Sequence, residues 1–211
     1  MSKTDRETPR MITFYFDCSS PWTYLGFHSV QPMAERLEVE VDWRPILVGG
    51  VFNAVNPSVY EARKAGPNPK ARYHGKDLQD WARFTGLEIK MPPSVFPVNS
   101  VKVMRACILL KLEGKLVDFA TAAFEAYWRD DLDISKDEVV AAICERAGVD
   151  TGKVMEGIQD QAIKDRLREN TDELIARGGF GSPTIFVGDD MYFGNDRLVL
   201  VEEAIRRARS E

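Results

Sequence analysis

The sequence has few of the residues that hold metal ions or form redox pairs. Its 211 residues include only two histidines, His28 and His74, and three cysteines, Cys18, Cys107 and Cys144, which lie far apart and form no C-x-x-C motif. Neither histidine has a second ligand at the spacing of a metal site. We therefore expect no metal cofactor and no local dithiol chemistry, and this cysteine usage suits a reducing compartment.

The sequence also lacks a long apolar run and an excess of positive charge. No stretch approaches the ~20 apolar residues that a membrane-spanning helix needs, and residues 1–10 are polar, without a hydrophobic signal core. The net charge is −5, and Lys and Arg are interspersed among acids, so the positive face that nucleic acid requires is missing. We expect a flexible tail at 1–10 and a cytoplasmic protein with neither membrane nor nucleic-acid partners.

One stretch near the start combines a strand signal with a helix signal. An aromatic run at 14–16 is followed by small polar residues, and the sequence Ser20-Pro21 then opens an amphipathic segment. Ser20 is placed as a helix N-cap and Pro21 as the first helical residue. A strand that leads directly into a helix aims a hydroxyl and free N–H groups at one point, which favours an anion. The hydrolase motif Gly-x-Ser-x-Gly is absent, so Ser20 is better suited to donate a hydrogen bond to a thiolate than to act as a nucleophile.

Hydrophobic alternation occurs at both ends of the chain and is missing between them. A strand at 12–16, a helix at 21–36 and a strand at 39–43 predict a parallel, right-handed βαβ unit. Residues 44–57 mix turn formers with apolar residues and predict a loop that packs against something, part of which could be buried by a partner chain at 45–52. Strands at 184–187 and 191–193 predict a hairpin, and a closing amphipathic helix is expected at 196–209.

The middle of the chain is predicted to be helical. Helices are predicted at 70–84, 99–112, 115–128, 135–147 and 160–177, the fourth with a capping box formed by Ser135 and Glu138. The predicted fold class is α/β, with one domain built from 11–56 and 178–211 and an inserted all-helical domain at 57–177. The stretch at 178–184 has three glycines and a proline at the entry to a strand, so the Ser182–Pro183 bond is a candidate for the cis isomer.

Four motifs in order carry a family resemblance. The strand, the Ser20-Pro21-Trp22-Thr23 helix start, the proline before a later strand and the helical insertion look like the thioredoxin fold of DsbA-like proteins, with Ser20 and Thr23 in place of both cysteines. More closely, the chain resembles the 2-hydroxychromene-2-carboxylate isomerases and the related kappa-class glutathione transferases. The motifs that carry this resemblance are those at 16–22, 43–52, 180–184 and 193–197.

The resemblance implies a glutathione-binding homodimer and a set of site residues. Ser20 holds the glutathione sulfur as thiolate, and main-chain groups of Ser182, before Pro183, pair with the cysteinyl backbone. The γ-glutamyl end is implied to lie at the start of the last helix, and positions on the substrate side also carry over. The remaining implied residues are Pro183, Phe193, Gly194, Asn195 and Asp196 for glutathione and Asn53, Asn56 and Asn99 for the substrate.

Several of these positions have plain structural alternatives or depart from the family pattern. Asp196 could simply be the acid that stabilises a helix N-terminus, and Asn56 and Asn99 stand near proline turns, where Asn is common for backbone reasons. Asn53 stands where isomerase-like members have a lysine that would meet a substrate carboxylate. Asn195 replaces the more usual serine.

Three functions remain open from the sequence. The first is a glutathione-dependent isomerase in aromatic compound degradation, in which the thiolate adds to a conjugated carbonyl, the resulting single bond rotates and the thiolate leaves. The second is a kappa-like glutathione transferase that conjugates electrophiles. The third is a noncatalytic glutathione- or peptide-binding protein with a DsbA-like scaffold.

Overall fold

The computed structural model describes residues 11–64 and 68–210, so the tail predicted at 1–10 lies outside the described residues. Four strands form one mixed sheet in the order β2-β1-β3-β4, with β1 at Met11–Phe16, β2 at Glu40–Pro45, β3 at Thr184–Val187 and β4 at Asp190–Phe193. Strands β1 and β2 run parallel, while β3 is antiparallel to both β1 and β4. The predicted βαβ unit and hairpin are both confirmed.

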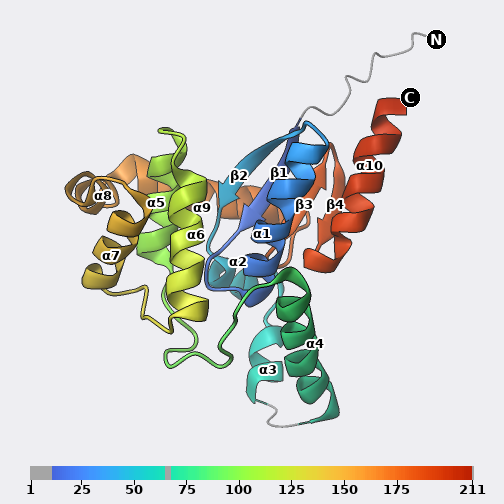
Figure 1. Cartoon of the computed structure of the whole chain (residues 1–211), viewed down its shortest axis with the longest axis horizontal. Helices are drawn as coiled ribbons and strands as arrows, with labels where there is room; N and C mark the ends of the chain where they lie inside the picture. The colour runs from blue at the N-terminus through green and yellow to red at the C-terminus, as the bar shows by residue number, and fades with distance from the viewer. Residues whose placement is uncertain (1–10, 65–67, 211) are drawn as a thin grey trace.

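Helices make up most of the rest of the described chain (Figure 1). They are α1 Pro21–Arg36, α2 Val48–Val55, α3 Ser58–Lys64, α4 Pro69–Thr85, α5 Val101–Lys111, α6 Leu116–Phe124 with a π-helical turn η1 at Glu125–Arg129, α7 Asp137–Ala147, α8 Thr151–Gly157, α9 Gln161–Ala176, the 3₁₀ turn η2 Asn195–Arg197 and α10 Leu198–Ser210. All five helices predicted between 57 and 177 are present. The short helices α3 and α8 were not predicted, because neither is long enough to show a clear period.

The two faces of the sheet pack against different helices, because successive strand residues point to opposite sides. Phe14 and Phe16 lie in a large cluster with residues of α1, α5, α6 and α10. Tyr15, between them, lies in a second cluster with Val51 of α2 and Leu174 of α9. Figure 1 shows α1 and α10 beside the sheet, and the helices α5 to α8 on the side of its β2 edge.

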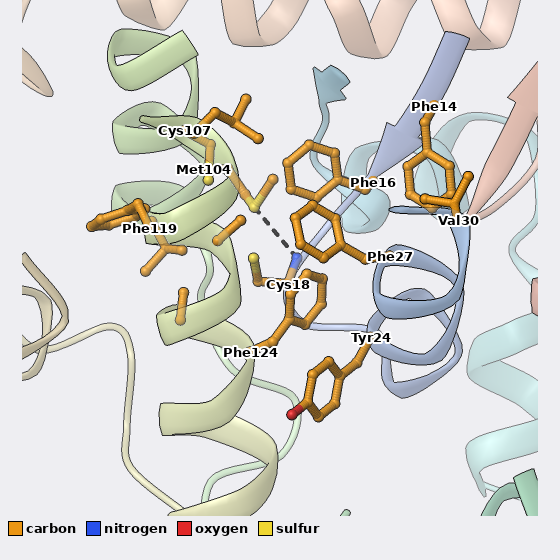
Figure 2. Packing of buried hydrophobic residues seen from close by; sticks show 14 of the residues in the cluster. Phe14, Phe16, Cys18, Tyr24, Phe27, Val30, Met104, Cys107, Phe119 and Phe124 are labelled. Carbon is orange, nitrogen blue, oxygen red and sulfur yellow. Dashed lines mark hydrogen bonds between the residues drawn. The ribbon is translucent and has the colours of Figure 1, made fainter. Parts of the chain in front are cut away.

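The large cluster joins the end of β1 to the helical part of the chain. Figure 2 shows Phe16, Phe27 and Phe124 in contact, with Cys18, Met104 and Cys107 beside them. The rings of Tyr24 and Phe124 stack at 5.2 Å with an interplanar angle of 8°. Burying aromatic side chains of this size is a main source of folding free energy, so the helical part supports the same strand end from which the site is built.

Two local predictions are wrong. Residues 44–57 were expected to be a loop, but β2 continues to Pro45 and residues 48–55 form helix α2. The Ser135 capping box does not form either, because the Ser135 hydroxyl and its N–H both bond to Asp133 and α7 begins at Asp137. Competition from a neighbouring Asp is a common reason for such an error.

The apolar residues at 45–52 are covered by the chain itself. Ile46 and Val51 are fully buried, in the cluster that Leu174 and Phe186 also join. The idea that a partner chain buries this stretch is therefore not needed to explain its composition. The division into a domain at 11–56 with 178–211 and a helical domain at 57–177 stays a prediction, and the described part of 57–177 contains helices without strands.

The chain leaves α9 through a tight passage that gives a test of the packing. A Cβ added at Gly179 would lie 2.1 Å from Cδ1 and 3.0 Å from the main-chain oxygen of the buried Leu174. We expect Gly179→Ala to lower the free energy of unfolding by about 1–3 kcal/mol, because the backbone must shift. Gly75→Ala is the matched control, since nothing lies within 4 Å of its new Cβ and alanine favours a helix by about 1 kcal/mol. Urea denaturation of both variants checks this, and equal stabilities would contradict the packing.

Candidate active site

Ser20 is the N-cap of α1, as the sequence predicted. Its backbone is extended, with φ −107° and ψ 123°, and its Oγ accepts a hydrogen bond from the N–H of Thr23 at 3.2 Å. Pro21 follows as the first helical residue, where a missing N–H has no consequence. Ser20 as a whole is 9% exposed, and its hydroxyl lies at the positive end of the helix dipole.

The hydroxyl of Ser20 faces the loop that carries Pro183. The Ser182–Pro183 bond is cis, as predicted, and Ser20 Oγ donates to the carbonyl oxygen of Ser182 at 3.2 Å. A Cβ added at Gly26 of α1 would lie 3.1 Å from Cγ of Pro183, so the helix and the loop are in close contact. Two stretches separated by more than 150 residues thus meet at one hydroxyl.

The side chain of Ser182 is held by residues that sequence reasoning did not single out. Its Oγ accepts from the N–H of Asp17 at 3.1 Å and shares a hydrogen bond of 2.7 Å with Oγ1 of Thr23. Thr23 is fully buried and Ser182 is 6% exposed. The signal for Thr23 was available, because this residue stands at the position of the second cysteine in the Cys-Pro-x-Cys pattern.

Asp17 is a buried carboxylate that joins three segments. Its Oδ1 accepts from the N–H of Ser19 at 2.9 Å and its Oδ2 from the N–H of Val48, the first residue of α2, at 2.8 Å. Burial raises the pKa of the Asp17 carboxyl, while hydrogen bonds from Ser19, Val48 and the Ser100 hydroxyl act in the opposite direction. Since Ser100 directly precedes α5, the N-termini of α2 and α5 both meet this carboxyl, and their dipoles favour a negative charge there.

Cys18 lies in the same loop but is unsuited to be a nucleophile. It is fully buried, its N–H points to the sulfur of Met104 at 3.4 Å (Figure 2), and its carbonyl oxygen accepts from Nε1 of Trp128. Burial raises the pKa of the Cys18 thiol well above its ordinary value, and the adjacent Cys107 adds to the rise. A buried thiol of this kind is inert, so Cys18 is not a candidate nucleophile.

A second polar segment lies beside the proline loop. The N–H of Gly194 donates to the carbonyl oxygen of Pro183 at 3.1 Å, and the ring of Phe193 packs against Phe180 at 4.5 Å. Asn195 is 6% exposed, and its Nδ2 has no hydrogen-bond partner within the part of the chain that the structure describes. Asp196 forms an ion pair with the adjacent Arg197, and its side chain is 43% exposed.

The three asparagines expected on the substrate side lie in different surroundings. Asn56 belongs with the loop, because its Nδ2 donates to the carbonyl oxygen of Phe180 at 3.1 Å. Asn53, on α2, accepts from the hydroxyl of Tyr60 at 2.8 Å, and among the described residues its side chain makes no hydrogen bond to the proline loop. Asn99 accepts from the N–H of Val101 at 3.0 Å, so in this structure it acts at the start of α5.

No group of His, Cys, Asp and Glu that could hold a metal ion occurs among residues 11–64 and 68–210. Within those same residues, no helix is both long and apolar enough to cross a membrane. The groups present at the site are one hydroxyl, main-chain groups and helix N-termini, which can donate hydrogen bonds to an anion and stabilise its charge.

Comparison with known proteins shows which family the chain belongs to. The family model described as the DsbA-like thioredoxin domain matches residues 11–206. A 2-hydroxychromene-2-carboxylate isomerase of Pseudomonas sp. (strain C18) is 30% identical over 203 residues, covering 92% of this chain and 90% of that protein. Glutathione S-transferase kappa 1 of Rattus norvegicus is 24% identical over 213 residues, with 92% and 89% of the two chains covered.

A solved structure of a 2-hydroxychromene-2-carboxylate isomerase superposes with a TM-score of 0.80 at 28% identity, covering 93% of this chain and 95% of that one. The fold class is thereby confirmed as the thioredoxin-like fold of DsbA-like proteins. The chain belongs to the DsbA-like thioredoxin-domain family and, within it, to the family of the 2-hydroxychromene-2-carboxylate isomerases. The kappa-class glutathione transferases are more distant relatives of the same chain.

The role of Asp17 gives the second prediction. Asp17→Asn replaces one of two carboxylate acceptors with an amide donor that faces a main-chain N–H, so one N–H is left buried without a partner. We expect the free energy of unfolding at neutral pH to fall by about 1–3 kcal/mol. Asp118→Asn is the control, because that side chain is exposed and its ion pair with Lys115 is long, at 3.7 Å, so its effect stays within about 0.5 kcal/mol. A loss no larger than that of the control would show that Asp17 does not fasten α2 to the loop.

Proposed function

We propose that this protein is a glutathione-dependent isomerase of the 2-hydroxychromene-2-carboxylate type, active in aromatic compound degradation. The observation that carries the proposal is the hydroxyl of Ser20, which lies at the N-terminus of α1 and faces the cis-Pro183 loop. Relatives named as isomerases support the reaction type, and relatives named as glutathione transferases support glutathione as the cofactor. A homodimer in the cytoplasm is part of the same proposal and rests on the family resemblance.

One observation supports a glutathione site independently of the family resemblance. Nδ2 of Asn195 is buried without a partner among the described residues, and such a donor costs about 1–3 kcal/mol unless a ligand accepts from it. The γ-glutamyl carboxylate would accept from Asn195, while the half-exposed Asp196 would pair with the γ-glutamyl ammonium. The N-terminus of the turn η2 and the Gly194 main chain complete a polar end beside Pro183.

At the other end, Ser20 and Ser182 would exchange hydrogen-bond partners on binding. In this structure the Ser20 hydroxyl donates to the carbonyl oxygen of Ser182 at 3.2 Å. Rotation of the hydroxyl toward a sulfur releases that carbonyl, which then accepts an N–H from the cysteinyl backbone. Thr23 and Asp17 hold the Ser182 side chain throughout, so the loop need not move for the exchange.

Glutathione, when bound, supplies a thiolate that adds to and later leaves the conjugated substrate. The protein's part is to keep the sulfur ionised. Ser20 donates one hydrogen bond to it, and the dipole of α1 favours the negative charge. Asn56 lies at the edge of the same loop and Asn99 at the start of α5, and both are proposed to contact the substrate.

A kappa-like transferase is the alternative, and position 53 favours it. The chain has an amide there, engaged with Tyr60, where the isomerase pattern has a lysine for a substrate carboxylate. Purified protein assayed for isomerisation of a 2-hydroxychromene-2-carboxylate and for conjugation of a model electrophile separates the two. Retention of glutathione without either activity would support the noncatalytic alternative.

The proposal predicts the effect of removing one hydroxyl. A hydrogen bond to a charged group is worth about 1.5–3 kcal/mol, and 1.36 kcal/mol corresponds to one pKa unit. We therefore expect Ser20→Ala to raise the pKa of the bound glutathione thiol by about one to two units and to slow turnover at neutral pH. Thiolate absorbance of the complex, titrated in both proteins, measures the change.

A matched variant separates this role from helix capping. Asp150 caps α8 through the N–H of Lys153, so Asp150→Ala should cost about 1 kcal/mol of stability while leaving the thiol pKa unchanged. If Ser20→Ala behaves in the same way, with a lower melting temperature and an unaltered thiol pKa, Ser20 is only a cap and the catalytic assignment fails.

A further inference from the structure

A groove that contains none of the proposed glutathione or substrate residues lies between α2, α5 and α9. Its volume is about 510 Å³, within the range of about 300–1,000 Å³ of small-molecule sites. Leu47, the N-cap of α2, and Gly50 and Ala54 within that helix contribute to its wall. These positions recur every three or four residues and define one side of the helix, and Asn53 does not line the groove. We call it the α2–α5–α9 groove.

The groove contains an arginine, Arg105, for which the described residues provide no partner. Nε of Arg105, on α5, is buried and makes no hydrogen bond, and no ion pair of Arg105 is found within the described chain. A guanidinium offers five donors in a planar fork and stays charged at any physiological pH. A buried donor left without an acceptor calls for an explanation, and an anion in the groove supplies one.

A second cation faces the same space. Lys164, on α9, lines the groove and is only partly exposed, and it too makes no ion pair among the described residues. Of the two acids in the wall, Asp165 already accepts from Arg168 and Gln161. Arg168 also lines the groove and is the partner of Asp165, and Asp172 is exposed. Three cations and two acids line the groove, so its net charge is positive.

The wall also has apolar residues, beside the polar Gln161 and Thr171, and these would contact the body of the ligand. Leu47, Leu167 and Ile175 contribute side chains, and Gly50 and Ala54 leave room beside them. A fully hydrated inorganic ion would gain nothing from these contacts, whereas an apolar group would bury surface there. The combination of two cations with an apolar wall matches an organic carboxylate better than a free phosphate.

We propose that the α2–α5–α9 groove binds a small organic carboxylate with an apolar body, with the carboxylate between Arg105 and Lys164 and the apolar body on Leu167 and Ile175. The groove is a site separate from Ser20, and its occupation does not depend on whether the protein binds glutathione. A bidentate contact from Arg105 would satisfy its buried Nε.

Benzoate is the probe, and benzyl alcohol is its neutral counterpart of similar shape. NMR titration of the full chain should show benzoate binding about tenfold more tightly than benzyl alcohol, the difference expected from one charged hydrogen bond. Arg105→Met and Lys164→Met should each abolish this preference. Arg83→Met, at an exposed arginine of α4, should retain it, and a thermal melt of each variant checks folding; should Arg105→Met fail to fold, Lys164→Met carries the test.

Three outcomes would overturn the proposal. Equal affinity for benzoate and benzyl alcohol would show that the cations do not take part. An unchanged preference in both groove variants would place the carboxylate elsewhere. Displacement of benzoate by saturating glutathione, or its loss in Ser20→Ala, would show that the probe occupies the glutathione site; an unchanged dissociation constant in both conditions is expected.

Discussion

The buried carboxyl of Asp17 is the contact on which the site depends. It accepts the first N–H of α2 and the N–H of Ser19, while its own N–H donates to Ser182 across the sheet. Val48 and Ser182, which lie 31 and 165 residues after Asp17 in the sequence, are thereby fixed to the end of β1. A buried acid without a cation is costly, and here main-chain donors and helix N-termini offset that cost.

The polar contacts beyond Asp17 hold the hydroxyl of Ser20 in place. Thr23 and Asp17 hold Ser182, Ser182 accepts from Ser20, and the aromatic and sulfur-containing side chains of α5 and α6 exclude water behind the loop (Figure 2). In a DsbA-like protein with two cysteines, such a support would hold a reactive disulfide. With Ser20 and Thr23 at those positions the same geometry provides hydrogen bonds alone, which is why a thiol must come from a ligand in our account.

The sequence predicted the parts of the fold that local chemistry determines. The cap at Ser20, the parallel βαβ unit, the hairpin and the cis bond before Pro183 all follow from residues within a few positions of one another. Helix α2 did not, because Val48, Gly49 and Gly50 form a poor helix start. It forms because Asp17 accepts from Val48 and because Gly50 lies against Thr171 of α9, contacts that only the folded chain brings together.

The candidate site was predictable to a similar extent. Ser20, Ser182 and the segment at Asn195 came from motifs, and the structure places them around Pro183, while Asn53 and Asn99 make local contacts of their own. Asp17 lies within the motif at 16–22 but was given no role there, and Arg105 belongs to none of the motifs. Their importance comes from burial and from the presence or absence of partners, which a pattern of residue types cannot show.

The most direct measurement is a crystal structure of the chain with glutathione, because it shows the partner exchange at Ser20. The account predicts the sulfur within hydrogen-bonding distance of Ser20 Oγ, with the carbonyl oxygen of Ser182 accepting from the cysteinyl N–H of the ligand and the γ-glutamyl carboxylate at Nδ2 of Asn195. Glutathione bound with its sulfur away from Ser20, while Ser20 Oγ still donates to Ser182, would contradict it.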